Sequence, residues 1–245
     1  MRSPLQRFLL PQQGGATWVY DSMNMDGFGQ QLADFATPAT MKDISFNGND
    51  LSGVSGHIPF YRTNTLQQKH TLVFDSSKCM KGPIISYAGE LTIFLLIEAD
   101  IAFTSAAGNI ISYGAGGGIS IGNGSVDFTK ARFSCNGVGN FETTTSGILV
   151  NGQFLVLICQ LRTDGSNWFV DFWKNYNFIE TVSAAAPISS SDYFTLGALN
   201  SSSISGGWVG QFGFGAAFNS ALYRDQPSIF YQLQKTFCVR GGLAS

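Results

Sequence analysis

The stretch GISIG, residues 118–122, places Ser120 in the G-x-S-x-G pattern that carries the nucleophile of many hydrolases. That chemistry needs a sharp turn from a strand into a helix, and a histidine later in the chain to accept the serine proton. The segment that follows has the pattern of another strand, and both histidines, His57 and His70, precede Ser120. We therefore interpret GISIG as a turn between strands, and we expect both histidines to be solvated.

Side chains suited to metal binding do not gather in the sequence. The four cysteines form no CxxC pair and have no histidine at ligand spacing, which favours small buried hydrophobic residues over a metal site and leaves their disulfide state open. Oxygen ligands occur in two turns, as Asp164 with Asn167 and as Asn123 with Asp127. Both stretches are also ordinary turn chemistry. We expect no cofactor and no metal, with a calcium ion at the domain rim as the alternative.

The elements that would position these residues are strands. From about residue 66 the chain shows short segments of period 2; in LTIFLLIEAD, Leu91, Ile93, Leu95 and Ile97 share one face. QFLVLICQLR is a near-continuous apolar run, typical of a strand covered on both faces. TDGSN then predicts a hairpin into WFVDFWKN.

The stretch from residue 206 to residue 237 ends the strand pattern with a helix. One parity of its first half predicts an aromatic face formed by Trp208, Gly210, Phe212, Phe214, Ala216 and Phe218. Asp225 is the expected N-cap of a short helix, with Pro227 in its first turn. Ile229, Phe230 and Leu233 form the apolar stripe that would close the sandwich.

The order of these segments resembles the concanavalin A-like, laminin-G-like jelly rolls over residues 66–237. The resemblance rests on the Thr195-Leu196-Gly197 strand, the glycine-aromatic strand from Gly210 to Gly213 and the N-x-A-L segment from Asn219 to Gln226. It implies an all-β fold, a two-sheet antiparallel jelly-roll sandwich with a short C-terminal helix.

The resemblance also extends to glycosidases built on this fold, which carry a motif of the form E-x-D-x-x-E. Its two glutamates act as nucleophile and acid/base. Glu98 and Asp100 match the first two positions, but Phe103 stands at the third. Retaining hydrolysis needs two carboxyl groups about 5–5.5 Å apart, and phenylalanine cannot transfer a proton. We therefore expect no catalytic residues and no enzyme activity.

Residues 1–65 differ from the rest because their apolar residues follow neither the period of 2 of a strand nor the period of 3.6 of a helix for long. They nevertheless carry many aromatic side chains. We interpret them as an extended N-terminal arm attached to a jelly-roll domain at residues 66–245. Its expected anchors on neighbouring subunits are apolar side chains: Phe8, Leu9, Leu10, Trp18 and Tyr20. On this interpretation, deletion of residues 2–45 leaves a folded remainder.

Six aromatic residues outside the arm anchors are candidates for stacking on sugars, although core packing explains most of them better. They are Tyr61, Tyr87, Tyr113, Trp168, Trp173 and Tyr176. Asn175, Tyr176 and Asn177 lie in a predicted turn between strands. This turn is the sequence's candidate site for glycan binding.

Composition excludes several classes of partner. Charged residues make up only 12% of the chain and the net charge is −2, which argues against nucleic acid. The longest apolar run has seven residues, too few for membrane insertion, and the apolar stretch at residues 8–10 is too short for a signal peptide.

The function expected from these observations is a structural component of a virus particle, made in the host cytoplasm and located in the virion. A bacteriophage head-decoration or tail-fibre protein is the most specific form of this hypothesis, with other particle subunits and copies of itself as partners. The alternative is a lectin-like carbohydrate-binding module that recognises host surface glycans.

Overall fold

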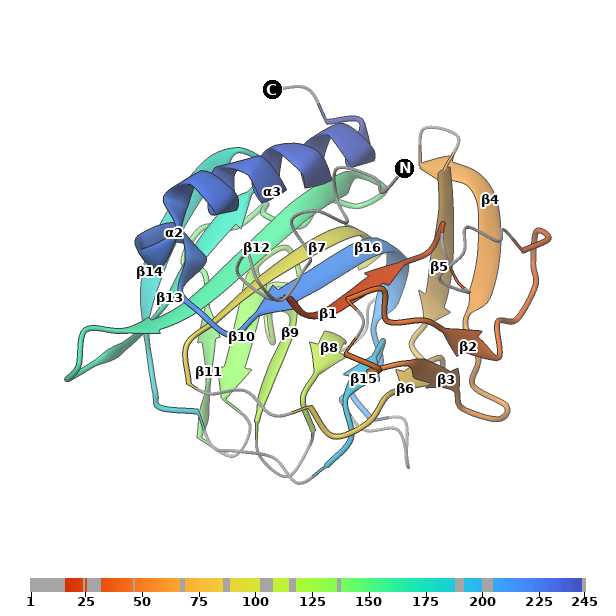
Figure 1. The fold of residues 1–245 in the computed structure, drawn as a ribbon, viewed down its shortest axis with the longest axis horizontal. Coiled ribbons are helices and arrows are strands. Elements are labelled where there is room, and N and C mark those ends of the chain that lie inside the picture. The colour runs from red at the N-terminus through yellow and green to blue at the C-terminus, as the bar shows by residue number, and fades with distance from the viewer. Residues whose placement is uncertain are drawn as a thin grey trace.

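The computed structural model describes residues 16–23, 25, 32–45, 47–66, 69–85, 89–101, 108–114, 118–135, 138–187, 192–199 and 205–243. These residues form two antiparallel β-sheets packed face to face, with a helix on the outer face of one of them (Figure 1). The predicted all-β two-sheet sandwich with a C-terminal helix is confirmed.

The first sheet, which we call sheet A, carries the helix and has the strand order β14-β13-β12-β7-β16-β5-β4. Strand β1 also pairs with β16, beside Phe214 to Phe218, while β5 pairs with the earlier part of the same strand. The bounds are β1 Ala16–Asp21, β4 Phe60–Leu66, β5 Lys69–Asp75, β7 Leu91–Ala99, β12 Phe154–Thr163, β13 Trp168–Lys174, β14 Asn177–Ala184 and β16 Val209–Phe218.

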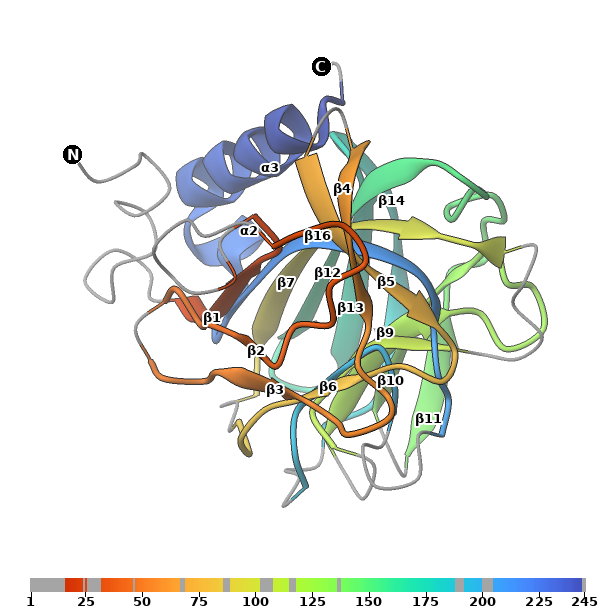
Figure 2. The same ribbon diagram turned by 90° about the vertical axis from the view of Figure 1, so that its right-hand side faces the viewer.

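The second sheet, sheet B, has the order β11-β10-β9-β8-β15-β6-β3-β2 and covers the inner face of sheet A. Figure 2 shows the two sheets from the side. The bounds are β2 Thr40–Met41, β3 Leu51–Gly53, β6 Met80–Lys81, β8 Asn109–Ser112, β9 Ile119–Asn123, β10 Ala131–Cys135, β11 Gly139–Glu142 and β15 Thr195–Leu196.

Two helices follow β16, α2 at Leu222–Asp225 and α3 at Pro227–Gly241. Proline opens α3, where its missing N–H costs no helical hydrogen bond, as predicted. The predicted N-cap is wrong, because Asp225 ends α2 and the N-cap of α3 is Gln226, which makes no side-chain capping bond. Gly242 ends α3 in the left-handed conformation that glycine adopts without strain. No helix among the described residues is long and apolar enough to span a bilayer.

The apolar side chains form two clusters, one on each face of sheet A. The main core lies between the sheets and includes Ile93, Leu95, Trp208 and Phe212. The second core lies between sheet A and α3. There the ring centroid of Phe94 on β7 lies 5.5 Å from that of Phe230 and 5.3 Å from that of Phe237, both on α3. Sheet A is therefore buried on both faces in its centre, which explains the near-continuous apolar runs of β7 and β12.

The alternation predicted for β7 is confirmed, but that of β16 is corrected. Leu91, Ile93, Leu95 and Ile97 all point into the main core. In β16 the pairing with β7 shifts between Phe212 and Phe214. This bulge inserts one extra residue, so Phe212 enters the main core while Phe214 and Phe218 enter the core under α3. A single aromatic face therefore does not exist.

The described part of residues 1–65 belongs to the sandwich. Strand β1 lies in sheet A, β2 and β3 lie in sheet B, and Trp18 and Tyr20 are 0% exposed in the main core. The indole Nε1 of Trp18 donates a hydrogen bond of 2.8 Å to the hydroxyl of Tyr113. The expected arm with a boundary at residue 65 is therefore wrong for these residues, and Trp18 and Tyr20 are not surface anchors. Phe8, Leu9 and Leu10 lie outside the described residues.

The cysteines and histidines fall largely in the interior. All four cysteines are buried and free, as small hydrophobic residues would be, and burial raises the pKa of the Cys159 thiol. His57 is half-buried, with its Nδ1 atom 2.8 Å from the main-chain oxygen of Ser77. His70 is only 8% exposed and stacks on Tyr61 at a centroid distance of 5.3 Å, so the expectation that it is solvated is wrong.

Candidate functional site

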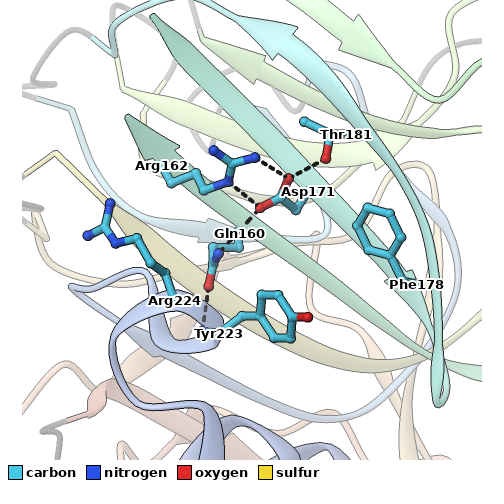
Figure 3. Close-up of a pocket in the computed structure, with 7 residues that line it drawn as sticks. All are labelled: Gln160, Arg162, Asp171, Phe178, Thr181, Tyr223 and Arg224. Carbon is cyan, nitrogen blue, oxygen red and sulfur yellow. Dashed lines mark hydrogen bonds and ion pairs between the residues drawn. The ribbon is translucent and has the colours of Figure 1, made fainter. Parts of the chain in front are cut away.

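A pocket of about 340 Å³ opens on the outer face of sheet A, beside the short helix α2 (Figure 3). Strands β12, β13 and β14 form its floor, and α2 forms one side, so the pocket lies where the helical cover of the sheet ends. Its lining combines charged, amide and aromatic side chains: Gln160, Arg162, Asp171, Phe178, Thr181, Tyr223 and Arg224. We call this the α2 pocket.

Asp171 is the centre of a hydrogen-bond network on the floor of the α2 pocket. Arg162 donates to both of its carboxylate oxygens, from Nε at 2.6 Å and from Nη2 at 3.1 Å. The hydroxyl of Thr181 donates to Oδ1 at 2.6 Å, and Nε2 of Gln160 donates to Oδ2 at 3.4 Å. The side chain of Asp171 is 5% exposed, so these donors replace the water that burial removes.

The alternation of strand residues places this network on one face. Gln160 and Arg162 are two residues apart on β12, and Gln160 pairs directly with Asp171 on β13. Asp171 in turn pairs with Thr181 on β14. The four side chains therefore stand side by side on three neighbouring strands, on the face opposite the main core.

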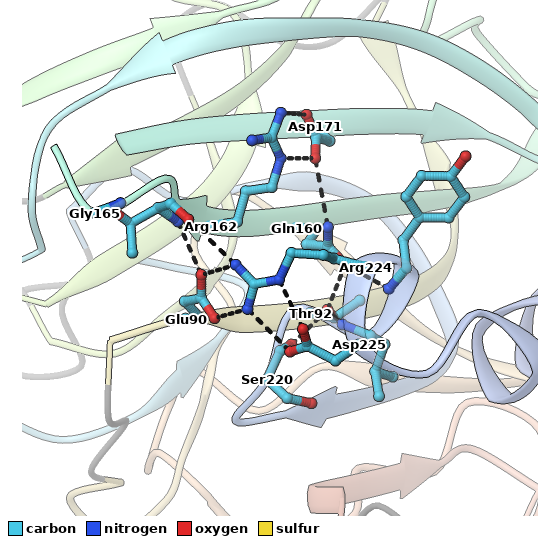
Figure 4. Close-up of polar contacts among 12 residues, drawn as sticks. Glu90, Thr92, Gln160, Arg162, Gly165, Asp171, Ser220, Arg224 and Asp225 are labelled. Atoms are coloured by element: carbon cyan, nitrogen blue, oxygen red, sulfur yellow. Dashed lines mark hydrogen bonds and ion pairs between the residues drawn. The ribbon is translucent and has the colours of Figure 1, made fainter. Parts of the chain in front are cut away.

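Arg224 fixes α2 against the sheet. Its guanidinium lies between two carboxylates, donating to Glu90 from Nη1 at 2.7 Å and Nη2 at 2.6 Å (Figure 4). It also donates to Asp225 from Nε at 2.7 Å and to the main-chain oxygen of Thr163 at 3.2 Å. The hydrogen bonds from Arg224 hold the pKa of Glu90 below its ordinary value. One residue earlier in α2, the main-chain N–H of Tyr223 donates to Oε1 of Gln160 at 2.8 Å.

Aromatic rings border the polar floor. Phe178 on β14 is 54% exposed and Tyr223 on α2 is 41% exposed. Buried Trp173 supports both of them, with its ring centroid 5.4 Å from that of Phe178 and 5.3 Å from that of Tyr223. Exposed aromatic side chains held in place by a buried one form a rigid apolar surface beside hydrogen-bonding groups.

This arrangement suits a ligand that has both apolar and hydroxyl faces. Binding pockets are usually concave and partly aromatic, with a few fixed polar groups that set orientation. In the α2 pocket the polar groups are already held by one another, because Asp171 receives four hydrogen bonds and Arg162 is bound at two nitrogens. A ligand therefore meets a preformed surface rather than mobile side chains.

The predicted turn at residues 175–177 adjoins the α2 pocket but does not line it. Asn175 adopts the left-handed conformation at φ 56°, and its side-chain oxygen accepts a hydrogen bond of 2.9 Å from the main-chain N–H of Val156. Tyr176 packs against the core under α3, and Asn177 is exposed. Asn175 therefore stabilises the hairpin. Phe178, three residues later, is the residue of this segment that lines the α2 pocket.

The other aromatic candidates are mostly core residues, as expected. Tyr61, Tyr113 and Trp173 are buried, and Trp168 packs partly buried against the main core. Tyr87 lies outside the described residues. Sequence inspection considered Trp173 but missed the two exposed rings that it supports, because Phe178 and Tyr223 belong to segments more than forty residues apart in the chain.

The residues considered for hydrolysis lie elsewhere. Glu98 is half-buried on the outer face of sheet A, where its Oε2 accepts a hydrogen bond of 2.6 Å from Gln211. Burial, and then the charge of Asp100, raise the pKa of Glu98. The interpretation of GISIG as a turn is wrong, because Ile119–Asn123 form strand β9; Ser120 is 1% exposed in this strand and does not sit at a strand-to-helix turn. Phe103 lies outside the described residues.

The oxygen ligands considered for calcium act as turn residues. Oδ1 of Asp164 accepts from the main-chain N–H groups of Ser166 and Asn167, and Oδ1 of Asp127 accepts from the main-chain N–H and the hydroxyl of Thr129. Asn123 uses its side-chain oxygen to accept from Gly108. In the part of the chain that the structure describes, no group of three or more histidine, cysteine or acidic residues is placed to hold a metal ion.

No protein-family model matches the sequence, and no curated protein matches it. Solved structures do match the fold. Domain 4 of AbnA, an extracellular GH43 arabinanase from Geobacillus stearothermophilus determined with arabinotriose, is similar at a TM-score of 0.61 and 13% identity, over 89% of this chain and 98% of that domain. A GH54 α-l-arabinofuranosidase is similar at a TM-score of 0.57 and 12% identity, over 91% of this chain and 59% of that one.

The receptor-binding domain of botulinum neurotoxin D is also similar, at a TM-score of 0.56 and 10% identity, over 89% of this chain and 52% of that one. At these identities the similarity shows the fold. It confirms a β-sandwich of the jelly-roll kind predicted from the sequence, and nothing in it points to a virus particle.

Proposed function

We propose that this protein is a non-enzymatic carbohydrate-binding module and that the α2 pocket is its glycan site. The observation that carries the proposal is the pairing of two exposed rings, Phe178 and Tyr223, with the preformed network of Arg162, Asp171 and Thr181. Sugar rings present C–H faces that stack on aromatic rings and hydroxyl groups that bond to planar polar side chains. The α2 pocket offers both kinds of contact within about 340 Å³.

The proposal that the protein binds glycans without cleaving them rests on the number of carboxyl groups in the α2 pocket. Among the described residues that line the α2 pocket, Asp171 alone is acidic, and four donors already bind its oxygens. Glycoside hydrolysis by the usual mechanisms needs a second carboxyl group across the scissile bond. The similar structures include a domain determined with arabinotriose, which supports a sugar-binding role for this kind of sandwich.

The test is glycan binding by the whole chain and by two matched variants. Phe178→Ala removes one of the two exposed rings of the α2 pocket, the one on edge strand β14, and we expect it to weaken binding at least tenfold. Phe60→Ala removes another exposed ring from β4, at the opposite edge of sheet A, and we expect no change. Screening on a glycan array followed by calorimetry with the strongest hit gives the affinities. Equal loss in both variants, or none in either, contradicts the placement of the site.

The hypothesis of a virus-particle component stays a prediction. Two of its five expected anchors, Trp18 and Tyr20, are internal, and the other three lie outside the described residues. Mass spectrometry of purified particles is the direct test, since the protein would have to be present in them. A particle protein can also bind glycans, so this result does not decide the role of the α2 pocket.

A further inference from the structure

We propose that the α2 pocket selects uncharged oligosaccharides and discriminates against chains that carry a carboxylate or sulfate group. This inference rests on the proposed function and names its ligand class. Two arginines line the pocket, which at first sight suggests an acidic sugar. The contacts of those arginines indicate the opposite.

Arg224 has no donor left for a ligand. A guanidinium carries five N–H bonds. Those of Arg224 are directed at Glu90, Asp225 and the main-chain oxygen of Thr163, through five contacts of 2.6–3.2 Å. An acidic sugar would have to displace one of these carboxylates to bind Arg224, and the displaced carboxylate would lose its partner.

The positive charge of Arg162 is neutralised by the carboxylate of Asp171, with which it is in direct contact. Arg162 forms a two-point pair with Asp171, which is the strongest geometry for a guanidinium and a carboxylate. Its guanidinium also lies 4.9 Å from the ring centre of Phe169. Its remaining nitrogen, Nη1, takes part in neither bond to Asp171 and can donate to a neutral hydroxyl group without separating the pair.

The balance of charge around the α2 pocket is negative. Arg162 and Arg224 face three carboxylates, those of Asp171, Glu90 and Asp225, which gives a net formal charge of −1. An anionic ligand would therefore lose its hydration without gaining a free cation. A hydroxyl group avoids this cost, because it donates to a carboxylate oxygen and accepts from an N–H group.

The experiment compares matched glycans with the intact protein. An array carries neutral chains beside their acidic counterparts, such as N-acetyllactosamine with its sialylated and sulfated forms, and methyl-esterified with free oligogalacturonides. Calorimetry then measures the strongest pair between 50 and 500 mM NaCl. We expect the acidic member to bind at least fivefold more weakly, and the affinity for the neutral member to be unaffected by salt.

The outcomes separate this inference from the function on which it rests. Equal or tighter binding of the acidic member overturns the inference while the glycan-binding function stands. Binding of no glycan at all overturns both.

Two variants test the physical reason. Asp225→Asn removes one carboxylate from Arg224 at an exposed position, and we expect it to reduce the discrimination against acidic chains at least twofold. Asp171→Asn leaves Arg162 uncompensated, and we expect a larger reduction, provided that circular dichroism shows a folded protein. The control is Asp34→Asn, which removes an exposed charge that pairs with Arg62 on β4, outside the α2 pocket. If Asp225→Asn behaves like Asp34→Asn, the electrostatic explanation is wrong.

Discussion

At the residue scale, Gly197 and Gly147 adopt left-handed backbone conformations, at φ 94° and φ 76°, in different surroundings. A Cβ atom on Gly197 would lie 2.3 Å from the ring of Phe74, whereas a Cβ atom on Gly147 would meet nothing within 4 Å. At both positions a residue with a Cβ atom would be strained, because the backbone has a positive φ. Of the two, only Gly197 also excludes a side chain by lack of space, since the chain just after β15 passes directly over the ring of Phe74 there.

This pair separates backbone strain from overpacking. We expect Gly147→Ala to lower the free energy of unfolding by about 1 kcal/mol, the usual strain of a left-handed residue. We expect Gly197→Ala to cost about 1–3 kcal/mol more, because Phe74 must move within a packed core. Urea unfolding followed by circular dichroism measures both values. Equal losses would show that Phe74 adapts freely to the added methyl group.

The protonation of Glu98 should make the free energy of unfolding depend on pH. Because burial raises its pKa in the folded protein, the favourable contribution of its protonated form is present in full below the unfolded pKa of about 4.3. That contribution is lost as the pH rises through the higher folded pKa.

The variant Glu98→Gln removes this titration and keeps a side-chain oxygen to accept from Gln211. We expect it to be more stable than the native protein at pH 7 and similar to it at pH 4. Thermal unfolding at both values checks the expectation. A variant that is less stable at pH 7 would mean that the charged form of Glu98 is the favoured one.

At the element scale, β16 shows how one strand serves two cores. Its bulge between Phe212 and Phe214 turns successive aromatic side chains to opposite faces of sheet A. Gly215, just after the bulge, leaves room for the neighbouring rings, since a Cβ atom there would lie 3.0 Å from Phe212 and 3.1 Å from Trp18. The strand therefore joins the inner core to the layer under α3.

Strand β1 depends on this arrangement, because its residues alternate between the same two cores. Trp18 and Tyr20 pack between the sheets, while Ala16 and Val19 pack under α3. Arg240 on α3 donates to the carboxylate of Asp21 at the end of β1 and so ties the helix to this strand. Strand β1 therefore contributes to both cores of a domain whose strand pattern in the sequence begins at residue 66.

Deletion of residues 2–45 is therefore expected to abolish folding, in contrast to the remainder predicted from the sequence alone. The point variant Trp18→Ala should cost about 3–5 kcal/mol of unfolding free energy, as large aromatic truncations in cores do. Thr17→Ala, at a partly exposed neighbouring position, is the control and should cost less than about 1 kcal/mol. Circular dichroism and thermal unfolding measure all three. A folded deletion variant with an unchanged melting temperature would contradict this account.

At the scale of the whole molecule, sheet A is covered on its outer face only in part. Helix α3 buries the centre of β7 and β12, and the chain reaches it through α2 (Figure 1). Where that cover ends, polar and aromatic side chains of β12, β13 and β14 on the outer face of the sheet form the α2 pocket. The proposed glycan site is thus a consequence of how far the helix extends over the sheet.

The sequence by itself determined the alternation of β7, the helix at the chain end with Pro227 in its first turn, and the buried state of the cysteines. These depend on local periodicity and on the chemistry of single residues. Only the tertiary structure decided that β1 joins sheet A, that β16 changes face at a bulge, and that Phe178, Tyr223 and Asp171 line one pocket. The physical reason is that register, bulges and contacts between distant strands depend on which segments pair, and local pattern does not encode that choice.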